Sequence, residues 1–98
     1  MNNPSHLSLT PEQAMHLAEF FRTLADPSRV RIIAALLEGE VNVGTLAEIV
    51  GISESAVSHQ LRTLRQMRLV RARKQGREVY YRLDDDHVAD LFRRSLDH

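Results

Sequence analysis

Apolar residues recur at helical spacing over the first half of the chain. Thr10 followed by proline is the signal of a helix start, and the apolar stripe behind it runs to about Leu24. The pair Asp26-Pro27 repeats this signal and opens a second helix, which Gly39 ends. The pattern predicts two helices after a flexible N-terminus of residues 1–9.

Two further helices follow with very little chain between them. A short apolar helix over about residues 43–50 is joined by residues 51–53, Gly-Ile-Ser, to a longer helix. On the longer helix Val57, Leu61 and Leu64 recur at i, i+4 and i+7, so this side should face the core. Two helices joined by a three-residue turn with glycine match the helix-turn-helix motif.

The pattern then changes from helical spacing to alternation. Residues 70–73 and 79–83 alternate apolar and polar positions across a turn at residues 74–77, which is typical of a β-hairpin. A last helix begins at Asp86, with apolar positions at i, i+4 and i+8 from Val88. We therefore predict a mainly α fold with a β-hairpin wing, a winged helix-turn-helix in the order α-α-α-α-β-β-α.

Composition limits the fold to one domain, which we place at residues 10–98. The chain has 98 residues and 43% hydrophobic content, enough for a small core that dimerisation would enlarge. Because it has no cysteine, a disulfide framework and a thiolate metal site are excluded. The longest apolar run, residues 32–37, is far shorter than the roughly 20 residues of a membrane span, and no secretory signal is evident. We expect a cytoplasmic protein with no membrane partner.

The charges are unevenly distributed although the formal net charge is zero. From Ser55 to Arg77 there is no acid, and the cations are Arg62, Arg65, Arg68, Arg71, Arg73, Lys74 and Arg77. A phosphate backbone responds to the local field and not to the sum over the chain. The segment is either a nucleic-acid-binding face or an ordinary solvated basic surface.

The solvent-facing side of the longer helix carries side chains suited to DNA. At about 100° per residue, the positions opposite its buried side are Ser55, His59, Arg62 and Gln66, with Ser58 at the flank. These side chains can bond to base edges or phosphates. Lys74 and Arg77 at the hairpin tip are placed to reach an adjoining minor groove or phosphates. Glu54, also in the first turn, favours the helix dipole but would be repelled by phosphate.

Catalysis is not indicated. The adjacent Ser58 and His59 would point about 100° apart on a helix, so they are not aligned as a nucleophile and its base. We therefore predict a binding protein and not an enzyme.

Three segments resemble those of the ArsR/SmtB repressors, and the likeness extends from about Leu17 to His98. The segments read LADPSRVRI at residues 24–32, SAVSHQL at 55–61 and LVRARKQGR at 69–77. The resemblance implies a homodimer of winged helices, built on the first and last helices, that represses an operon until an inducer binds. It also implies that the family's DNA-contacting positions fall on Ser55, Ser58 and His59.

The resemblance implies a metal inducer, which the family binds at more than one place. One site uses cysteines near the short third helix; here that motif reads EVNVG at residues 40–44, with Asn42 where the first thiolate would be. That site is absent, and Asn42 is better explained as a helix N-cap. The other site, in the zinc-sensing branch, has Asp-x-His and a second His in the last helix, which here are Asp85, His87 and His98.

Geometry limits how these three residues could bind one metal. His87 and His98 are eleven residues apart, so they share a helix face but lie roughly 16 Å apart along its axis. In an antiparallel pair of last helices, the partner's His98 could approach Asp85 and His87, giving two symmetric sites. Carboxylate and imidazole ligands suit zinc and, less selectively, cobalt or nickel.

The family's fourth ligand would fall at position 101, which this sequence does not include. Four explanations stay open: a trimmed sequence, completion by water or a terminal carboxylate, a weak or lost site, or an Asp85 that only starts a helix beside exposed histidines. We predict a dimeric repressor that a divalent transition metal, zinc, releases from a palindromic operator. The alternatives are a relative with a non-metal inducer or none, and a dimeric interaction module that does not bind DNA.

Overall fold

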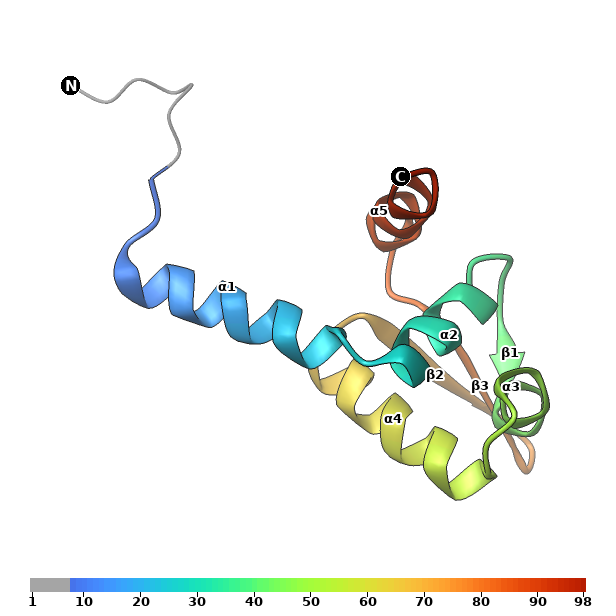
Figure 1. Ribbon diagram of the computed structural model, residues 1–98. Coiled ribbons are helices and arrows are strands. Elements are labelled where there is room, and N and C mark those ends of the chain that lie inside the picture. Colours follow the sequence, from blue (N-terminus) through green and yellow to red (C-terminus); the bar gives the residue numbers. More distant parts are fainter. Residues whose placement is uncertain (1–7) are drawn as a thin grey trace.

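The computed structural model describes residues 8–98, which form five helices and a three-stranded antiparallel sheet (Figure 1). In chain order the elements are α1 (Pro11–Leu24), α2 (Pro27–Ala35), β1 (Val41–Asn42), α3 (Val43–Val50), α4 (Glu54–Gln66), β2 (Val70–Gln75), β3 (Glu78–Leu83) and α5 (Asp86–Leu96). The predicted winged helix-turn-helix order is confirmed, with β1 in addition. Residues 1–7 of the predicted flexible N-terminus lie outside the described residues.

Side chains fix where the helices begin. The capping oxygens, each accepting a backbone N–H three residues on, belong to Thr10, Asp26, Asn42, Ser53 and Asp85. At α1 the bond is reciprocal, because the Gln13 side chain accepts the Thr10 N–H. The predicted N-cap role of Asn42 is confirmed. Local capping bonds thus account for the position of each helix start.

The core lies between α2, α3, α4 and the sheet. Its fully buried side chains include Ile32, Ile33, Leu46, Val57, Leu61 and Leu64. The predicted core side of α4 is therefore confirmed. The α2 helix ends at Ala35, earlier than the predicted end at Gly39, because the next turns are tighter: the N–H groups of Leu37 and Gly39 donate to carbonyls three residues back.

The sheet has the strand order β1-β3-β2. The predicted hairpin is confirmed as β2 and β3, with Val70 opposite Leu83 and a turn in which Gly76 has a left-handed φ of 62°. The β1 strand pairs Val41 with Tyr81 on the outer side of β3. Two residues are too few to show alternation, so the sequence pattern does not reveal β1.

The first and last helices lie at the edge of this core, to which α5 contributes the buried Ala89. The α1 helix has no buried residue and extends away from the rest of the fold, and α5 stands apart from α3 and α4 (Figure 1). A largely apolar groove of about 460 Å³ lies between α1, α2 and α5, and its lining includes Phe21, Val30, Leu91 and Leu96. Both helices therefore present apolar faces that a single chain leaves in solvent. No helix within residues 8–98 combines the length and apolar character of a membrane span.

The cap at the start of α2 leads to a prediction about acid stability. Hydrogen bonds from the Ser28 hydroxyl (2.5 Å) and the Arg29 N–H (3.1 Å) lower the pKa of Asp26 from its ordinary 3.8. A lowered pKa gives stability that is present above the unfolded-state pKa and is lost as pH falls through the folded-state pKa. We expect Asp26→Ala to cost about 1 kcal/mol near pH 7 and less in acid.

Urea unfolding at neutral and at acidic pH measures this effect. Asp26→Asn is the control, since asparagine keeps a capping oxygen without a charge that can titrate. The difference in free energy of unfolding between Asp26→Asn and Asp26→Ala should stay constant with pH. The difference between wild type and Asp26→Ala should become smaller in acid. A difference between wild type and Asp26→Ala that does not change with pH would refute the assignment.

Candidate nucleic-acid interface and metal centre

A tight turn between α3 and α4 fixes where α4 begins. Gly51 has a φ of 78°, and the N–H groups of Gly51 and Ile52 both donate to the Ala47 carbonyl, closing α3. Ser53 then caps α4 at once through the Ala56 N–H. With one side of α4 held in the core, the opposite side remains open along its whole length.

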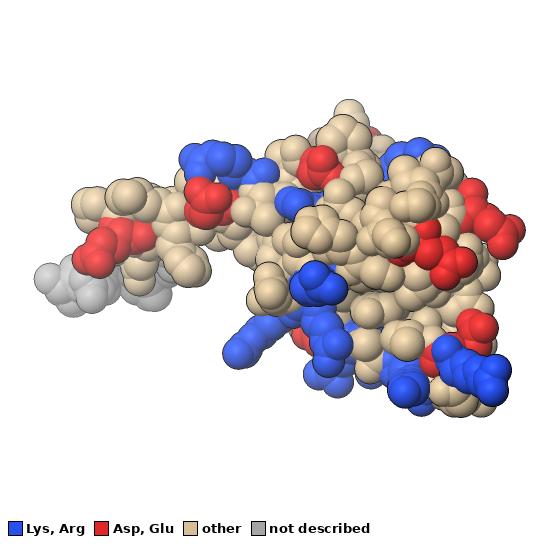
Figure 2. All heavy atoms as spheres, turned by 90° about the horizontal axis from the view of Figure 1, so that it is seen from below, with Lys and Arg blue, Asp and Glu red and all other residues tan. Residues whose placement is uncertain are grey.

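The predicted contact residues lie on that open side. Those exposed on α4 are Ser55, Ser58, His59, Arg62 and Gln66. Ser58 also lines a groove of about 330 Å³ with Arg77, between the starts of α3 and α4 and the hairpin. The structure thus brings the helix and the wing together at one groove, and Figure 2 shows Lys and Arg gathered along the lower part of this side of the molecule.

The wing is less basic than the sequence run suggested. The Arg71 Nε donates to the Asp84 carboxylate at 2.6 Å, and Arg73 makes two bonds of 2.8 and 2.9 Å to Glu40 while its guanidinium lies over the Tyr80 ring. The Arg73 guanidinium also lowers the pKa of Glu40. Two of the seven cations are therefore neutralised by acids from elsewhere in the chain.

The cations at the wing tip differ from these two. Lys74 is exposed near the end of β2, and Arg77 is exposed in the hairpin turn. The groove beside them has mixed charge, because Glu54 and Glu78 line it as well. Arg62 on α4 and Lys74 on the wing lie outside this groove. They are therefore better placed to contact phosphate than the groove lining, which includes acids.

The predicted metal ligands lie at the two ends of α5. Asp85 Oδ1 and His87 Nδ1 are 3.7 Å apart, and their side chains are 52% and 96% exposed. Tetrahedral zinc, with bonds of about 2.0–2.1 Å, holds neighbouring ligand atoms about 3.3 Å apart, so this pair fits one ion with a small adjustment. The bond from the Val88 N–H to Asp85 Oδ1, 3.1 Å long, orients the carboxylate.

One chain does not complete this centre. His98 lies eleven residues further along, beyond the other end of α5. Within residues 8–98 of a single chain, no three His, Asp or Glu side chains gather closely enough to hold a metal. The structure brings two of the three predicted ligands together and places the third at the other end of α5.

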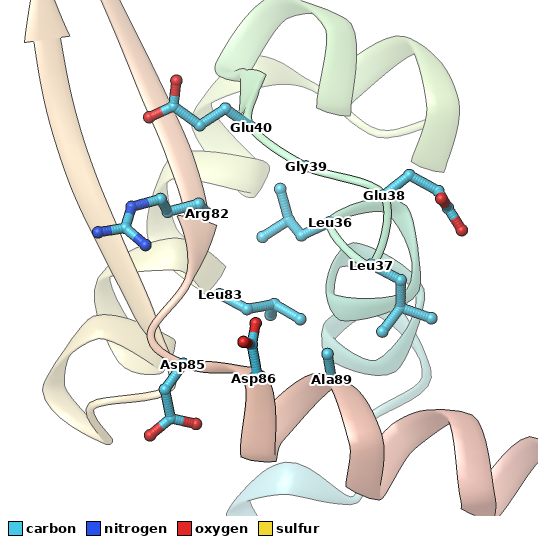
Figure 3. Close-up of a pocket in the computed structure, with 10 residues that line it drawn as sticks. All are labelled: Leu36, Leu37, Glu38, Gly39, Glu40, Arg82, Leu83, Asp85, Asp86 and Ala89. Atoms are coloured by element: carbon cyan, nitrogen blue, oxygen red, sulfur yellow. The ribbon is translucent and has the colours of Figure 1, made fainter.

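A second group of acids near α5 does not form a site. A hollow of about 250 Å³ beside the start of α5 is lined by Glu38, Glu40, Asp85 and Asp86 (Figure 3). Their carboxylates do not converge, since Glu40 is bonded to Arg73, Asp85 caps α5, and Glu38 points away from the hollow. Near the start of α5, the acidic and imidazole groups that do approach each other are those of Asp85 and His87.

Comparison with known proteins identifies the family of this chain. The family model described as "Bacterial regulatory protein, arsR family" matches residues 26–72, which run from the cap of α2 into β2. The chain is 54% identical over 95 residues to a transcriptional repressor SmtB homolog from Synechocystis, an alignment that covers 97% of this chain and 70% of that protein.

Solved structures agree with the fold. The crystal structure of the AntR antimony-specific transcriptional repressor matches with a TM-score of 0.79 and 33% identity, covering 96% of this chain and 88% of that one. A homodimeric winged helix-turn-helix DNA-binding domain from Mycobacterium bovis matches with a TM-score of 0.77 and 30% identity, covering 93% and 87%. The resemblance found in the sequence is confirmed: this chain belongs to the arsR family of bacterial regulatory proteins, which are DNA-binding transcriptional regulators and not enzymes.

Proposed function

We propose that this protein is a dimeric repressor that binds a palindromic operator and leaves it when a divalent transition metal, zinc, binds between the last helices. The observation that carries the proposal is the exposed polar side of α4 beside a cationic wing tip, in a chain of this family. A repressor works where its operator is, so a cytoplasmic location is part of the proposal.

In this proposal α4 enters the major groove. In helix-turn-helix proteins the N-terminal part of the second helix lies nearest the base edges, which assigns base contacts to Ser55, Ser58 and His59. Phosphate contacts belong to cations and amides nearer the groove edge, Arg62 and Gln66. The wing tip, with Lys74 and Arg77, reaches the adjoining minor groove or its phosphates.

Salt dependence tests the DNA interface. Each cation that neutralises a phosphate releases counterions, so Arg62→Ala and Lys74→Ala should each lower affinity for all duplexes and reduce the salt slope by about 1. Arg71→Gln is the control, because its guanidinium is bonded to Asp84. Fluorescence anisotropy from low to moderate salt measures the slopes. Slopes equal to that of wild type in both alanine variants would overturn the interface.

The dimer follows from the apolar faces outside the core. Leu17 and Phe21 on α1 and Leu91 and Leu96 on α5 are exposed, and contiguous apolar surface of this kind marks an association site. A two-fold axis through these helices would cover the same patch on both chains at once. The solved homodimeric relative supports this arrangement.

A charge placed in this face should separate the chains. We expect sedimentation to find wild type at twice the 11.2 kDa chain mass and Leu91→Glu at the mass of one chain, since burying an unpaired carboxylate opposes association. Ile49→Glu is a matched control on α3, because Ile49 and Leu91 are 50% and 53% exposed. A monomeric wild type, or a dimeric Leu91→Glu, would exclude this interface.

The metal is proposed from the donor set. One carboxylate and one imidazole lie together at the start of α5, and the partner's His98 would add a second imidazole. A chain without cysteine offers no thiolate, so the set suits zinc, with cobalt or nickel as less selective choices. Bound there, the metal supplies a bridge between the two last helices.

Removing one imidazole tests the metal. We expect His87→Ala to lose zinc binding in calorimetry and zinc-dependent release from DNA, while affinity for DNA without zinc stays near wild type. Metal and DNA oppose each other by linkage, with a typical coupling of about 1–3 kcal/mol. His16→Ala, an exposed histidine on α1, is the control. Undiminished zinc binding by His87→Ala would remove this site from the proposal.

A further inference from the structure

A half-buried polar cluster lies on the side of α4 that faces the protein, away from the proposed DNA surface. Its members are Asp26, Ser28 and Arg29 at the start of α2, and Gln60 in the middle of α4. The Arg29 Nε donates to the Gln60 Oε1 at 2.6 Å, and the Gln60 Nε2 donates to the Ser28 Oγ at 3.0 Å. Gln60 thus uses both ends of its amide to attach α4 to the start of α2.

The same arginine also holds the end of α1. Its second donor, Nη1, bonds to the Thr23 carbonyl in the last turn of that helix. Carbonyls in the last turn of a helix have no partner within the helix, so Arg29 supplies one that would otherwise be missing. One planar guanidinium therefore contacts both α1 and α4, and its rigid fork fixes the two directions relative to each other.

Other contacts of α4 do not define its orientation so closely. Its buried Val57, Leu61 and Leu64 hold it through apolar packing, which is strong but has no direction of its own. Hydrogen bonds weaken steeply as their angles change. The cluster around Arg29 therefore adds directional contacts to the packing of the core, and these contacts resist a rotation of α4. The end of α4 also lies close to α1, since Thr23 and Gln66 line one shared pocket.

We infer that Arg29 and Gln60 are positioning residues that set the angle of α4 relative to α1, and through it the spacing of DNA half-sites that the dimer accepts. This inference rests on the proposed function, in which α1 forms the dimer interface and α4 reads DNA. Any rotation of α4 about α1 is repeated by the two-fold axis, so it changes the distance between the two reading helices. In such dimers that distance must match the half-site spacing of the duplex.

The test compares two spacings on the same DNA. Wild type first selects a two-fold symmetric duplex from a randomised library, and a second duplex carries one extra base pair between the half-sites. The readout is the spacing ratio, the affinity for the selected duplex divided by that for the lengthened one. We expect Gln60→Met and Arg29→Lys to lower this ratio at least about threefold, while affinity for an unrelated duplex stays within about twofold because phosphate contacts are kept.

A matched control separates positioning from simple stabilisation. Arg31, in the same helix, donates to the Val50 and Ile49 carbonyls at the end of α3 and, within residues 8–98, makes no hydrogen bond to α4. Arg31→Lys removes a comparable helix-end contact, so it should lower the melting temperature as Arg29→Lys does but keep the spacing ratio. A ratio that stays at the wild-type value in folded, dimeric Arg29→Lys and Gln60→Met overturns the inference.

Two further outcomes are also decisive. If Gln60→Met does not fold, Ser28→Ala replaces it, since this change removes the 3.0 Å bond to Gln60 and leaves the bond from the Arg29 N–H to Asp26 in place. A smaller fall in the spacing ratio then supports the inference, and an unchanged ratio overturns it. If wild type selects no symmetric duplex, the proposed function fails, which is distinct from a normal selection with unaffected variants.

Discussion

The burial of one side of α4 is the constraint on which the rest of this structure depends. Val57, Leu61 and Leu64 are fully buried against α2, α3 and the sheet, so the opposite side of the helix is held in solvent. The side chains on this solvent-facing side need no partner in the fold and are available for a ligand. The hairpin that covers the other side of the core ends beside the same helix, which places its tip at the edge of this exposed surface.

Two ion pairs in the wing reduce its positive charge and hold its strands in position. Arg71 with Asp84 and Arg73 with Glu40 are exposed pairs, which contribute little to stability. Their effect is geometric, because Arg73 ties the middle of β2 to the residue before β1 and lies over Tyr80. The two pairs hold the base and the middle of the hairpin in place, and Lys74 and Arg77 are the cations of the basic run that remain at its tip.

How much the sequence predicted depends on the range of the interactions. The helix starts and the hairpin follow from caps and periodicities within a few residues, and these predictions are confirmed. Strand β1 and the bond between Glu40 and Arg73 join positions about thirty or more residues apart, for which no local pattern exists. The run of cations from Ser55 to Arg77 predicted a stronger positive field than the structure has. The acids that neutralise Arg71 and Arg73 lie outside that run. The approach of Asp85 to His87 at the start of α5 follows from their local spacing, whereas His98 lies beyond the other end of that helix.

The connection between α5 and the DNA-reading part is short, and this matters for the proposed release. Only two residues separate the end of β3 from the start of α5, and the N–H of one of them, Asp84, donates to the Leu69 carbonyl just after α4. A shift at the start of α5 would therefore reach both the wing and the end of α4 without crossing a flexible linker. Because coupling is reciprocal, DNA that fixes α4 and the wing must also resist that shift, so the two ligands would compete through the fold and not through a shared surface.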